Sequence, residues 1–365
     1  MEQIRVLHVL GSLDIGGAET MVMNILRSLD RSEILFDFAV PGNGEGYYAG
    51  EIQALGGRIH PFTKRRESFW KNHREFAAII RKNNYKTIHF HTQNAFLTVL
   101  QIHAARKAGA QKIMVHSHNT RDWREGKLLF LHKCFRKSLC KYSDIQLSCG
   151  KEAAQWLYGT KEGIEIIPLP VDCDKFCYDE EAYARLRKEA GFANQTVYAH
   201  VGRFSEVKNH EFLIEIFKEL KKIQKDAVLM LMGSGEGRPL AEAKVREYHL
   251  EDAVFFLGNV AKVYEKLKMA DVFLFPSKYE GFPTVVLEAQ AAGLPCYISD
   301  RITEDISVTD LVKRLSLEMS ARAWATEILK EEDRKRTSRE FYNKQIREIY
   351  DSSVSRDRLS EIYKG

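Results

Sequence analysis

Two glutamates, Glu280 and Glu288, flank a Gly-Phe-Pro turn in the stretch "PSKYEGFPTVVLEAQAAGLP" of residues 276–295. The apolar run before the turn predicts a buried strand, and residues 283–292 predict a helix with Pro283 at its first position. The first backbone N–H groups of such a helix have no partner within the helix, and the helix dipole adds positive potential there. The sequence therefore predicts an anion site at this helix start.

The two carboxylates suit sugar hydroxyls. Thr284 and Glu288 are four residues apart, so they share one face of the predicted helix, and the Glu288 side chain tilts back toward the helix start. Beside a bound phosphate it can accept hydrogen bonds from a ribose diol. Glu280, in the preceding loop, could do the same for a sugar beyond the phosphates. A nucleoside diphosphate sugar would satisfy both carboxylates; the alternative is that both are ordinary solvated side chains.

A diphosphate also needs cations, and two of them follow another predicted strand. In "VGRFSEVKN", Arg203 comes directly after the strand and Lys208 begins the next helix. Guanidinium and ammonium groups both suit phosphate oxygens. Gly233 and Ser234, in "MGSGEG" after a further strand, allow the backbone to approach a ligand closely. We expect these loops to meet at the carboxyl edge of one parallel sheet.

The chain is long enough for two domains, and its 44% apolar content can fill two cores. Short β-rich runs alternate with helical patterns, which is typical of parallel α/β sheets. The runs are "IRVLHVL", "ILFDFAV", "TIHFH", "KIMVH" and "DIQLS", then "TVYAHVG", "AVLMLMG", "AVFFLG", "DVFLFPS" and "PCYIS". We therefore predict an α/β protein of two doubly wound, Rossmann-like domains facing across a cleft.

Two prolines between Pro168 and Asp172 suit an extended connector between the two series. The predicted boundaries are residues 1–168 for the first domain and 169–350 for the second. The charged, helical tail from about residue 318 is expected to pack on the outside. Residues 351–365 are expected to form a C-terminal helix that packs back toward the first domain.

The net charge of +5 is too small to indicate nucleic-acid binding, but residues 61–151 carry 19 Lys or Arg against 5 Asp or Glu. The six cysteines contain no C-x-x-C pair, which favours free thiols in a reducing cytosol and argues against a zinc site. We find neither a signal peptide nor a spanning segment. The expected location is the cytoplasm, with peripheral association at the inner face of the cell membrane.

Residues 121–142, "RDWREGKLLFLHKCFRKSLCKY", combine a cationic face with apolar side chains. One interpretation is a half-buried surface helix. The alternative is contact with anionic lipid or with a lipid-diphosphate acceptor. The apolar members of the stretch are Trp123, Leu128, Leu129, Phe130, Leu131, Phe135 and Leu139.

The order and spacing of "VGRFSEVKN", "LMGSGEG", "FFLGNV" and "ADVFLFPSKYEGFPTVVLEAQAAGLP" resemble the C-terminal half of the retaining glycosyltransferases of family four, which have the GT-B fold. The resemblance covers almost the whole second domain. "LGSLDIGGAET" resembles the family's acceptor-side glycine loop. "HSHNT" and "ISDRITEDI" resemble members that build capsular polysaccharides and exopolysaccharides.

The resemblance implies that Arg203 and Lys208 neutralise the donor diphosphate. It also implies that Glu280 holds the transferred sugar and Glu288 the ribose. This sequence departs from the family's pattern at two places. It has Leu169-Pro170 where an Asn-Gly is common in the family, and "SDRITED" lacks a glycine that is frequent there. The full set of expected donor-binding residues is Gly16, Gly17, Arg203, Lys208, Gly233, Ser234, Val260, Glu280, Gly281, Phe282, Thr284, Val285 and Glu288.

Four histidines, His89, His91, His116 and His118, lie at the ends of two predicted strands. A strand-end histidine is more often structural than catalytic, so three of the four are expected to be structural. In the family a histidine lies close to the reacting sugar, and His118, followed by Asn119, matches it best in position. His116 is the reserve candidate for this catalytic role.

Asp172 and Asp174 mimic the acidic pair with which other glycosyltransferases bind manganese, but they fall in the predicted connector. We expect no metal and no other cofactor, because Arg203, Lys208 and the helix start supply the positive charge. A structural role for the two aspartates is the preferred interpretation.

The sequence thus predicts a hexosyltransferase that moves a sugar, with retention, from a nucleoside diphosphate sugar, preferably a UDP-sugar, to a saccharide or polyprenyl-diphosphate-linked acceptor in capsule or exopolysaccharide synthesis. Two alternatives stay open: a nucleotide-sugar epimerase of the same fold, and a non-catalytic subunit that binds sugar nucleotides. An epimerase would release an altered nucleotide sugar from donor alone, whereas activity on a lipid-extract acceptor would exclude a non-catalytic subunit. No nucleic-acid partner is expected, since no recognisable module is present.

Overall fold

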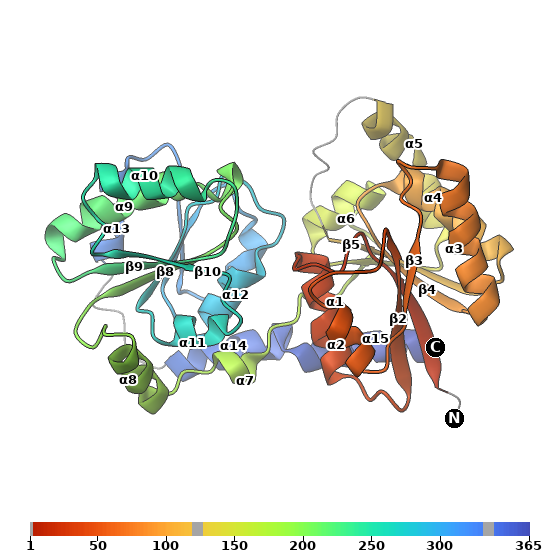
Figure 1. The fold of residues 1–365 in the computed structure, drawn as a ribbon, viewed down its shortest axis with the longest axis horizontal. Helices are drawn as coiled ribbons and strands as arrows, with labels where there is room; N and C mark the ends of the chain where they lie inside the picture. The colour runs from red at the N-terminus through yellow and green to blue at the C-terminus, as the bar shows by residue number, and fades with distance from the viewer. Residues whose placement is uncertain (1–2, 119–126, 331–338) are drawn as a thin grey trace. The chain divides into compact units, whose positions relative to one another are not determined.

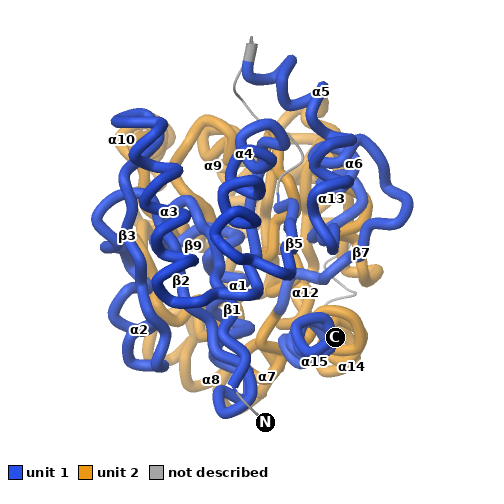
Figure 2. The backbone as a smooth tube through the Cα atoms, turned by 90° about the vertical axis from the view of Figure 1, so that its right-hand side faces the viewer, with its two compact units in different colours: residues 1–170, 352–365 blue, residues 171–351 orange. Residues whose placement is uncertain are grey.

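The computed structural model describes residues 3–118, 127–330 and 339–365. The chain divides into two compact units, distinguished by colour in Figure 2. Unit 1 comprises Met1–Pro170 and Ser352–Gly365, and unit 2 comprises Val171–Asp351. The last helix therefore belongs to the first unit, although it follows the second in sequence.

The described part of unit 1 has a seven-stranded sheet in the order β3-β2-β1-β4-β5-β6-β7, and all its pairings are parallel. Its strands are β1 (Ile4–Val9), β2 (Ile34–Pro41), β3 (Ile59–Phe62), β4 (Thr87–Thr92), β5 (Lys112–Ser117), β6 (Ile145–Ser148) and β7 (Glu165–Ile166). Its helices are α1 (Gly17–Ser28), α2 (Ala49–Ala54), α3 (Phe69–Asn83), α4 (Ala95–Lys107), α5 (Lys127–Tyr142), α6 (Lys151–Tyr158) and α15 (Ser352–Lys364). The strand order reverses between β1 and β4, the position at which open parallel sheets bind ligands.

Helices cover both faces of the unit 1 sheet (Figure 1). Buried residues of α3, α4, α5 and α6 form one core with one face, and α1 and α15 pack together on the other. Central strands that are covered on both sides must be apolar almost throughout, which explains the continuous runs seen in the sequence.

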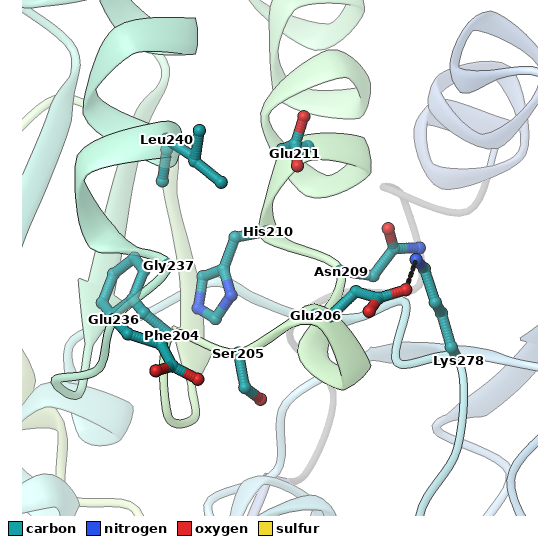
Figure 3. Close-up of a pocket in the computed structure, with 11 residues that line it drawn as sticks. Phe204, Ser205, Glu206, Asn209, His210, Glu211, Glu236, Gly237, Leu240 and Lys278 are labelled. Atoms are coloured by element: carbon teal, nitrogen blue, oxygen red, sulfur yellow. Dashed lines mark hydrogen bonds and ion pairs between the residues drawn. The ribbon is translucent and has the colours of Figure 1, made fainter.

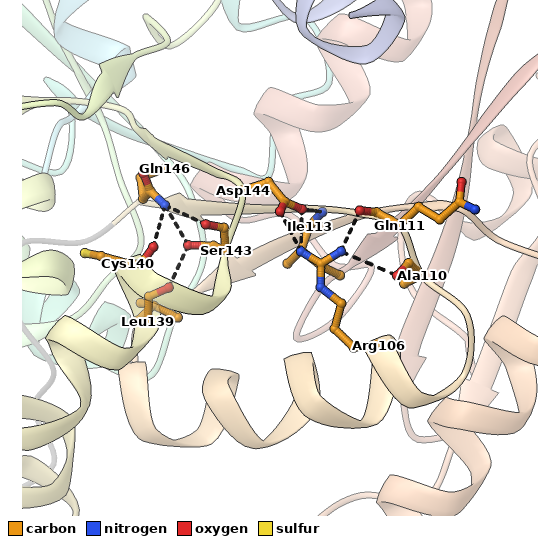
Figure 4. Close-up of polar contacts among 9 residues, drawn as sticks. All are labelled: Arg106, Ala110, Gln111, Ile113, Leu139, Cys140, Ser143, Asp144 and Gln146. Atoms are coloured by element: carbon orange, nitrogen blue, oxygen red, sulfur yellow. Dashed lines mark hydrogen bonds and ion pairs between the residues drawn. The ribbon is translucent and has the colours of Figure 1, made fainter.

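A polar network holds the beginning of β5 (Figure 4). The Arg106 guanidinium donates two hydrogen bonds of 2.6 Å to the Asp144 carboxylate, and it donates a third to the carbonyl of Gln111 at 2.5 Å. The same carboxylate accepts a hydrogen bond from the Ile113 N–H at 2.6 Å. Charge-assisted hydrogen bonds of this kind are among the strongest in proteins. They fix the start of the strand whose other end carries His116.

The described part of unit 2 has a six-stranded parallel sheet in the order β10-β9-β8-β11-β12-β13. Its strands are β8 (Val197–Val201), β9 (Val228–Met232), β10 (Val254–Gly258), β11 (Val272–Phe275), β12 (Cys296–Ser299) and β13 (Val312–Leu315). Its helices are α7 (Cys173–Phe176), α8 (Glu180–Glu189), η1 (Glu206–Lys208), α9 (His210–Ile223), α10 (Arg238–Glu247), α11 (Val263–Lys268), α12 (Thr284–Ala291), η2 (Glu304–Ile306), α13 (Ala321–Lys330) and α14 (Arg339–Tyr350).

Two doubly wound parallel sheets confirm the predicted fold class, and each predicted run forms a strand. The described part of the tail forms helices, and two of them bury a large aromatic side chain against their unit. Trp324 of α13 is fully buried in one core of unit 2, and Tyr363 of α15 is 3% exposed in unit 1. No helix among the described residues is long and apolar enough to cross a bilayer.

Candidate functional site

The predicted strand, loop and helix around Glu280 are present in unit 2 as β11, residues 276–283 and α12. Pro283 precedes the helix instead of forming its first residue. The Val286 N–H donates to the Pro283 carbonyl at 3.0 Å, so this N–H group near the helix start is already bonded. For the N–H groups of Thr284 and Val285 we see no hydrogen bond to the described residues. The helix start thus offers two donors.

Lys208 and Glu280 come from different loops and form an ion pair, with Nζ 2.6 Å from Oε1 and side chains 18% and 15% exposed. The ammonium also lies 4.6 Å from the centroid of the Phe275 ring. The Glu280 Oε1 atom is buried without a well-aligned hydrogen bond, so the contact is ionic and leaves donors of the ammonium for another oxygen. These two predicted site residues therefore meet at the carboxyl edge of the sheet.

Arg203 and Glu288 have no ion pair or side-chain hydrogen bond to the described residues. Arg203 is exposed in the loop after β8, whereas Glu288 is half-buried on α12. Burial raises the pKa of the Glu288 carboxyl to about 7. Elsewhere in unit 2 a buried charge is paired: Arg187 Nη1 lies 2.8 Å from the Asp271 carboxylate. A half-buried carboxyl without a partner is a feature of ligand sites.

The glycines after β9 have a structural reason that sequence reasoning missed. We predicted that "GSG" lets the backbone approach a ligand. Gly233 has a φ of +138°, and a Cβ there would lie 2.1 Å from the carbonyl oxygen of Gly202. A Cβ on Gly235 would lie 2.4 Å from the Phe204 carbonyl oxygen. Both glycines are therefore required by the adjoining loop that carries Arg203, whose neighbour Phe204 donates its N–H to the Ser234 carbonyl at 3.0 Å.

The remaining predicted residues of unit 2 lie around these loops. Gly281 is half-buried. Val260 and Phe282 are partly buried and pack against the core of unit 2. The Phe282 ring stacks on Tyr350 with centroids 6.1 Å apart.

A surface pocket of about 320 Å³ adjoins the Arg203 loop without containing the predicted charges (Figure 3). In it Lys278 Nζ pairs with Glu206 Oε1 at 3.1 Å, and the other charged residues that line it, Glu211 and Glu236, are acidic and unsuited to a diphosphate. We therefore place the candidate site at the charged loops and not in the pocket. The pocket is lined by Phe204, Ser205, Glu206, Asn209, His210, Glu211, Glu236, Gly237, Leu240, Ala241 and Lys278.

In unit 1, Gly16 and Gly17 lie where the glycine loop enters α1. A Cβ on Gly16 would lie 2.3 Å from a carboxylate oxygen of Glu19, whereas the space around Gly17 is open. That both glycines face a donor stays a prediction.

The four predicted histidines are joined by a fifth, His8 on β1, which sequence reasoning missed. Parallel pairing places His8 beside His89 and His91 beside His116. His91 Nε2 lies 2.9 Å from His8 Nδ1, and His91 Nδ1 lies 2.7 Å from His118 Nε2. Burial lowers the pKa of His118 to about 3, so its ring is neutral at pH 7. Asn119, named with it, lies outside the described residues.

The acidic pair of the connector is structural. The Asp172 carboxylate caps α7 by accepting the Lys175 N–H at 3.2 Å. The Asp174 carboxylate accepts a hydrogen bond from Arg347 Nη2 at 2.6 Å.

The amphipathic stretch is largely a half-buried helix. Its Leu139 is fully buried, and the Phe135 ring packs on Phe96 with centroids 5.0 Å apart. Phe130 is 68% exposed. Trp123 lies outside the described residues. The described part of α5 therefore presents one strongly exposed phenylalanine beside its cationic side chains.

Two family profiles match the two units in order. The profile described as Glycosyltransferase Family 4 matches residues 15–175, and Glycosyl transferases group 1 matches residues 183–348. EpsF of Bacillus subtilis (strain 168), named provisionally as a glycosyltransferase, is 36% identical over an alignment of 379 residues, covering 99% of this chain and 96% of the relative. The chain is a family 4 glycosyltransferase.

More distant relatives agree with this assignment. The capsular polysaccharide biosynthesis glycosyltransferase CapH of Staphylococcus aureus is 25% identical over 99% of this chain and 98% of the relative. An Escherichia coli UDP-Gal:alpha-D-GlcNAc-diphosphoundecaprenol alpha-1,3-galactosyltransferase is 28% identical over 61% of this chain and 59% of its own length.

Among solved structures, Anabaena HepE in complex with UDP has a TM-score of 0.81 at 16% identity, covering all of both chains. This likeness confirms the GT-B fold of the family 4 glycosyltransferase.

Proposed function

We propose that this glycosyltransferase transfers a sugar, with retention, from a UDP-sugar to a saccharide or polyprenyl-diphosphate-linked acceptor in the synthesis of a capsule or exopolysaccharide. The names of CapH and the E. coli relative support the polysaccharide product and the lipid-linked acceptor, and UDP in the HepE structure supports the nucleotide. Residues 1–168 form the acceptor-side domain, and residues 169–350 form the domain that binds the donor. The helix from residue 351 packs with the acceptor-side domain. The reaction takes place at the cytoplasmic face of the membrane.

One observation carries the proposal: unit 2 places Arg203 and Lys208 on loops at one edge of its sheet and Glu288 on the adjoining helix α12. Among the described residues, neither the Arg203 guanidinium nor the Glu288 carboxyl has an ion-pair or hydrogen-bond partner for its side chain. Arg203 binds oxygens of the donor diphosphate, and Lys208 divides its donors between the diphosphate and Glu280. Glu280 accepts hydrogen bonds from the transferred sugar. Glu288 accepts hydrogen bonds from the ribose diol. These hydroxyls take the place of the water molecules that burial has largely removed from the carboxyl.

The same groups account for the chemistry. The bond between the anomeric carbon and the diphosphate oxygen breaks, and the negative charge that develops on the leaving diphosphate is met by Arg203 and Lys208. The N–H groups of Thr284 and Val285 add to this stabilisation. The acceptor hydroxyl attacks the anomeric carbon from the face that the diphosphate leaves, so the configuration is retained. Its proton passes to the leaving diphosphate.

Unit 1 contributes Gly16, Gly17 and His118 to this reaction. Because the His118 ring is neutral, it acts through a hydrogen bond to the transferred sugar and not as a charged acid. No metal is required, since the protein supplies the cations.

Purified protein incubated with a panel of UDP-sugars and a polyprenyl-diphosphate-linked sugar tests the proposal. We expect UDP release coupled to extension of the lipid-linked sugar, and loss of both in Arg203→Gln. The matched control is Arg246→Gln, which changes an exposed arginine of α10 away from the candidate site. A new nucleotide sugar formed from donor alone would identify an epimerase. Donor binding without turnover on any acceptor would identify a non-catalytic subunit.

A further inference from the structure

Unit 1 contains a histidine cluster of five side chains from β1, β4 and the end of β5 that the proposed reaction uses only through His118. The members are His8, His89, His91, His116 and His118. Five of their ring nitrogens are buried and have no hydrogen-bond partner within residues 3–118, 127–330 and 339–365: Nε2 of His8, Nε2 of His89, both nitrogens of His116 and Nδ1 of His118. Unpaired buried polar atoms destabilise a fold, so this concentration of them indicates a ligand that the chain does not itself supply.

The inner part of the cluster offers three candidate metal ligands. One ring nitrogen from each of His8, His89 and His91 lies within 4.8 Å of the others. His8 and His89 are each 1% exposed, and His91 is half-buried. Three imidazoles with an open fourth position are a recurrent arrangement for zinc.

The surroundings of His89 support this interpretation. Its Nδ1 lies 2.8 Å from the Tyr363 hydroxyl, which comes from α15 and is buried. Metal-binding histidines usually use the second ring nitrogen in such a hydrogen bond, which fixes the tautomer and the ring orientation. The Nε2 atom of His89, which has no partner, is then the one left for an ion.

The chemical type of the ligand atoms determines which metal ion fits the cluster. The candidate ligand atoms are imidazole nitrogens, and a neutral imidazole binds a metal ion through the lone pair of one ring nitrogen. Neutral imidazoles suit zinc, copper, nickel and iron, whereas magnesium and calcium prefer oxygen ligands.

We propose that His8, His89 and His91 bind a divalent transition-metal cation of the Zn²⁺ type, with Tyr363 as the residue that orients His89. The ion links β1 and β4 to the C-terminal helix.

The test is calorimetric titration of ZnCl₂ into full-length protein without a polyhistidine tag, after treatment with a chelator. We expect one equivalent to bind per chain, and MgCl₂ to give no such binding. Tyr363→Phe keeps the aromatic ring and should weaken zinc binding about ten- to a hundredfold, the usual effect of losing a partner of a metal-bound histidine. His91→Ala should abolish the binding of this one equivalent of zinc.

Two control variants address binding elsewhere. His249→Asn removes an exposed histidine of unit 2 at a left-handed backbone position that asparagine tolerates, and Cys134→Ser removes an exposed thiol. Both should bind zinc like the parent.

The proposal is overturned if the parent binds no equivalent of zinc, if Cys134→Ser loses it, or if Tyr363→Phe and His91→Ala bind like the parent. Should His91→Ala fail to fold, Tyr363→Phe alone decides the question. The outcome does not depend on the sugar donor, because no nucleotide enters the experiment.

Discussion

The Glu288 carboxyl should make the free protein less stable than it could be. Burial raises its pKa from 4.5 to about 7, and each pKa unit is worth about 1.4 kcal/mol, so the charged form costs about 3 kcal/mol in the folded state. Well below pH 4.5 the group is protonated in both states and costs nothing. As pH rises from there to about 7, the unfolded state releases its proton first and stability falls. Above that range the full cost is present.

Glu288→Gln removes this cost because the amide stays neutral. Its free energy of unfolding should match that of the parent near pH 4.5 and exceed it by up to about 3 kcal/mol at about pH 8.5. Urea unfolding at both pH values measures the difference, with Glu251→Gln, an exposed glutamate of unit 2, as the control that should show none. The reasoning would be refuted if Glu288→Gln were less stable than the parent at the higher pH. It would also be refuted if the difference in free energy of unfolding between variant and parent were the same at both pH values.

The same variant should bind UDP more weakly. A hydrogen bond to a charged acceptor contributes about 1.5 to 3 kcal/mol, so its loss corresponds to about ten- to a hundredfold in Kd. A gain in stability together with a loss of affinity is the combination expected of a functional residue. Unchanged UDP affinity would remove Glu288 from the nucleotide site.

Further predictions concern the metal, the membrane, the loops and Glu280. Turnover should survive EDTA, because Arg203 and Lys208 meet the diphosphate charge; complete loss that Mn²⁺ restores would contradict this assignment. The protein should co-sediment with anionic vesicles and be released by salt, through the basic surface of residues 61–151, and equal binding to neutral vesicles would exclude an electrostatic cause. Gly233→Ala should destabilise the fold by at least about 2 kcal/mol, because the added Cβ would meet a backbone oxygen. Gly50→Ala, where the space around the Cβ is open, should not destabilise it, and urea unfolding measures the free energy of unfolding of both variants. Glu280→Gln should abolish most turnover with little change in UDP affinity, as kinetics and calorimetry would measure; full activity would make Glu280 a structural partner of Lys208.

The sequence predicted the central strands well because both faces of each are covered, which demands long apolar runs such as those of β1 and β2. Three of the four edge strands, β3, β7 and β13, were harder. β3 contains Pro61, which edge strands tolerate, and β7 has two residues. β13, with the sequence VKRL, carries two charges because it is half-exposed. None of these three has the pattern that marks a buried strand.

The site shows a similar division. Arg203, Glu280 and Glu288 could be proposed from the sequence because strand ends and a helix start are visible in it. The Lys208 to Glu280 ion pair could not, since it joins two loops that only the sheet brings together. His8 sits inside an apolar run and looks like a core residue until parallel pairing places it beside His89. That register was the missing signal.

The central claim is that the charged loops of unit 2 bind the diphosphate of a sugar nucleotide. Calorimetry of UDP with the parent, Arg203→Gln and the control Arg246→Gln tests it most directly. We predict that the parent and the control bind UDP alike and that Arg203→Gln binds about ten- to a hundredfold more weakly, through the loss of charge-assisted hydrogen bonds. Equal UDP binding by Arg203→Gln and the parent, or no binding of any nucleoside diphosphate by the parent, would contradict the claim.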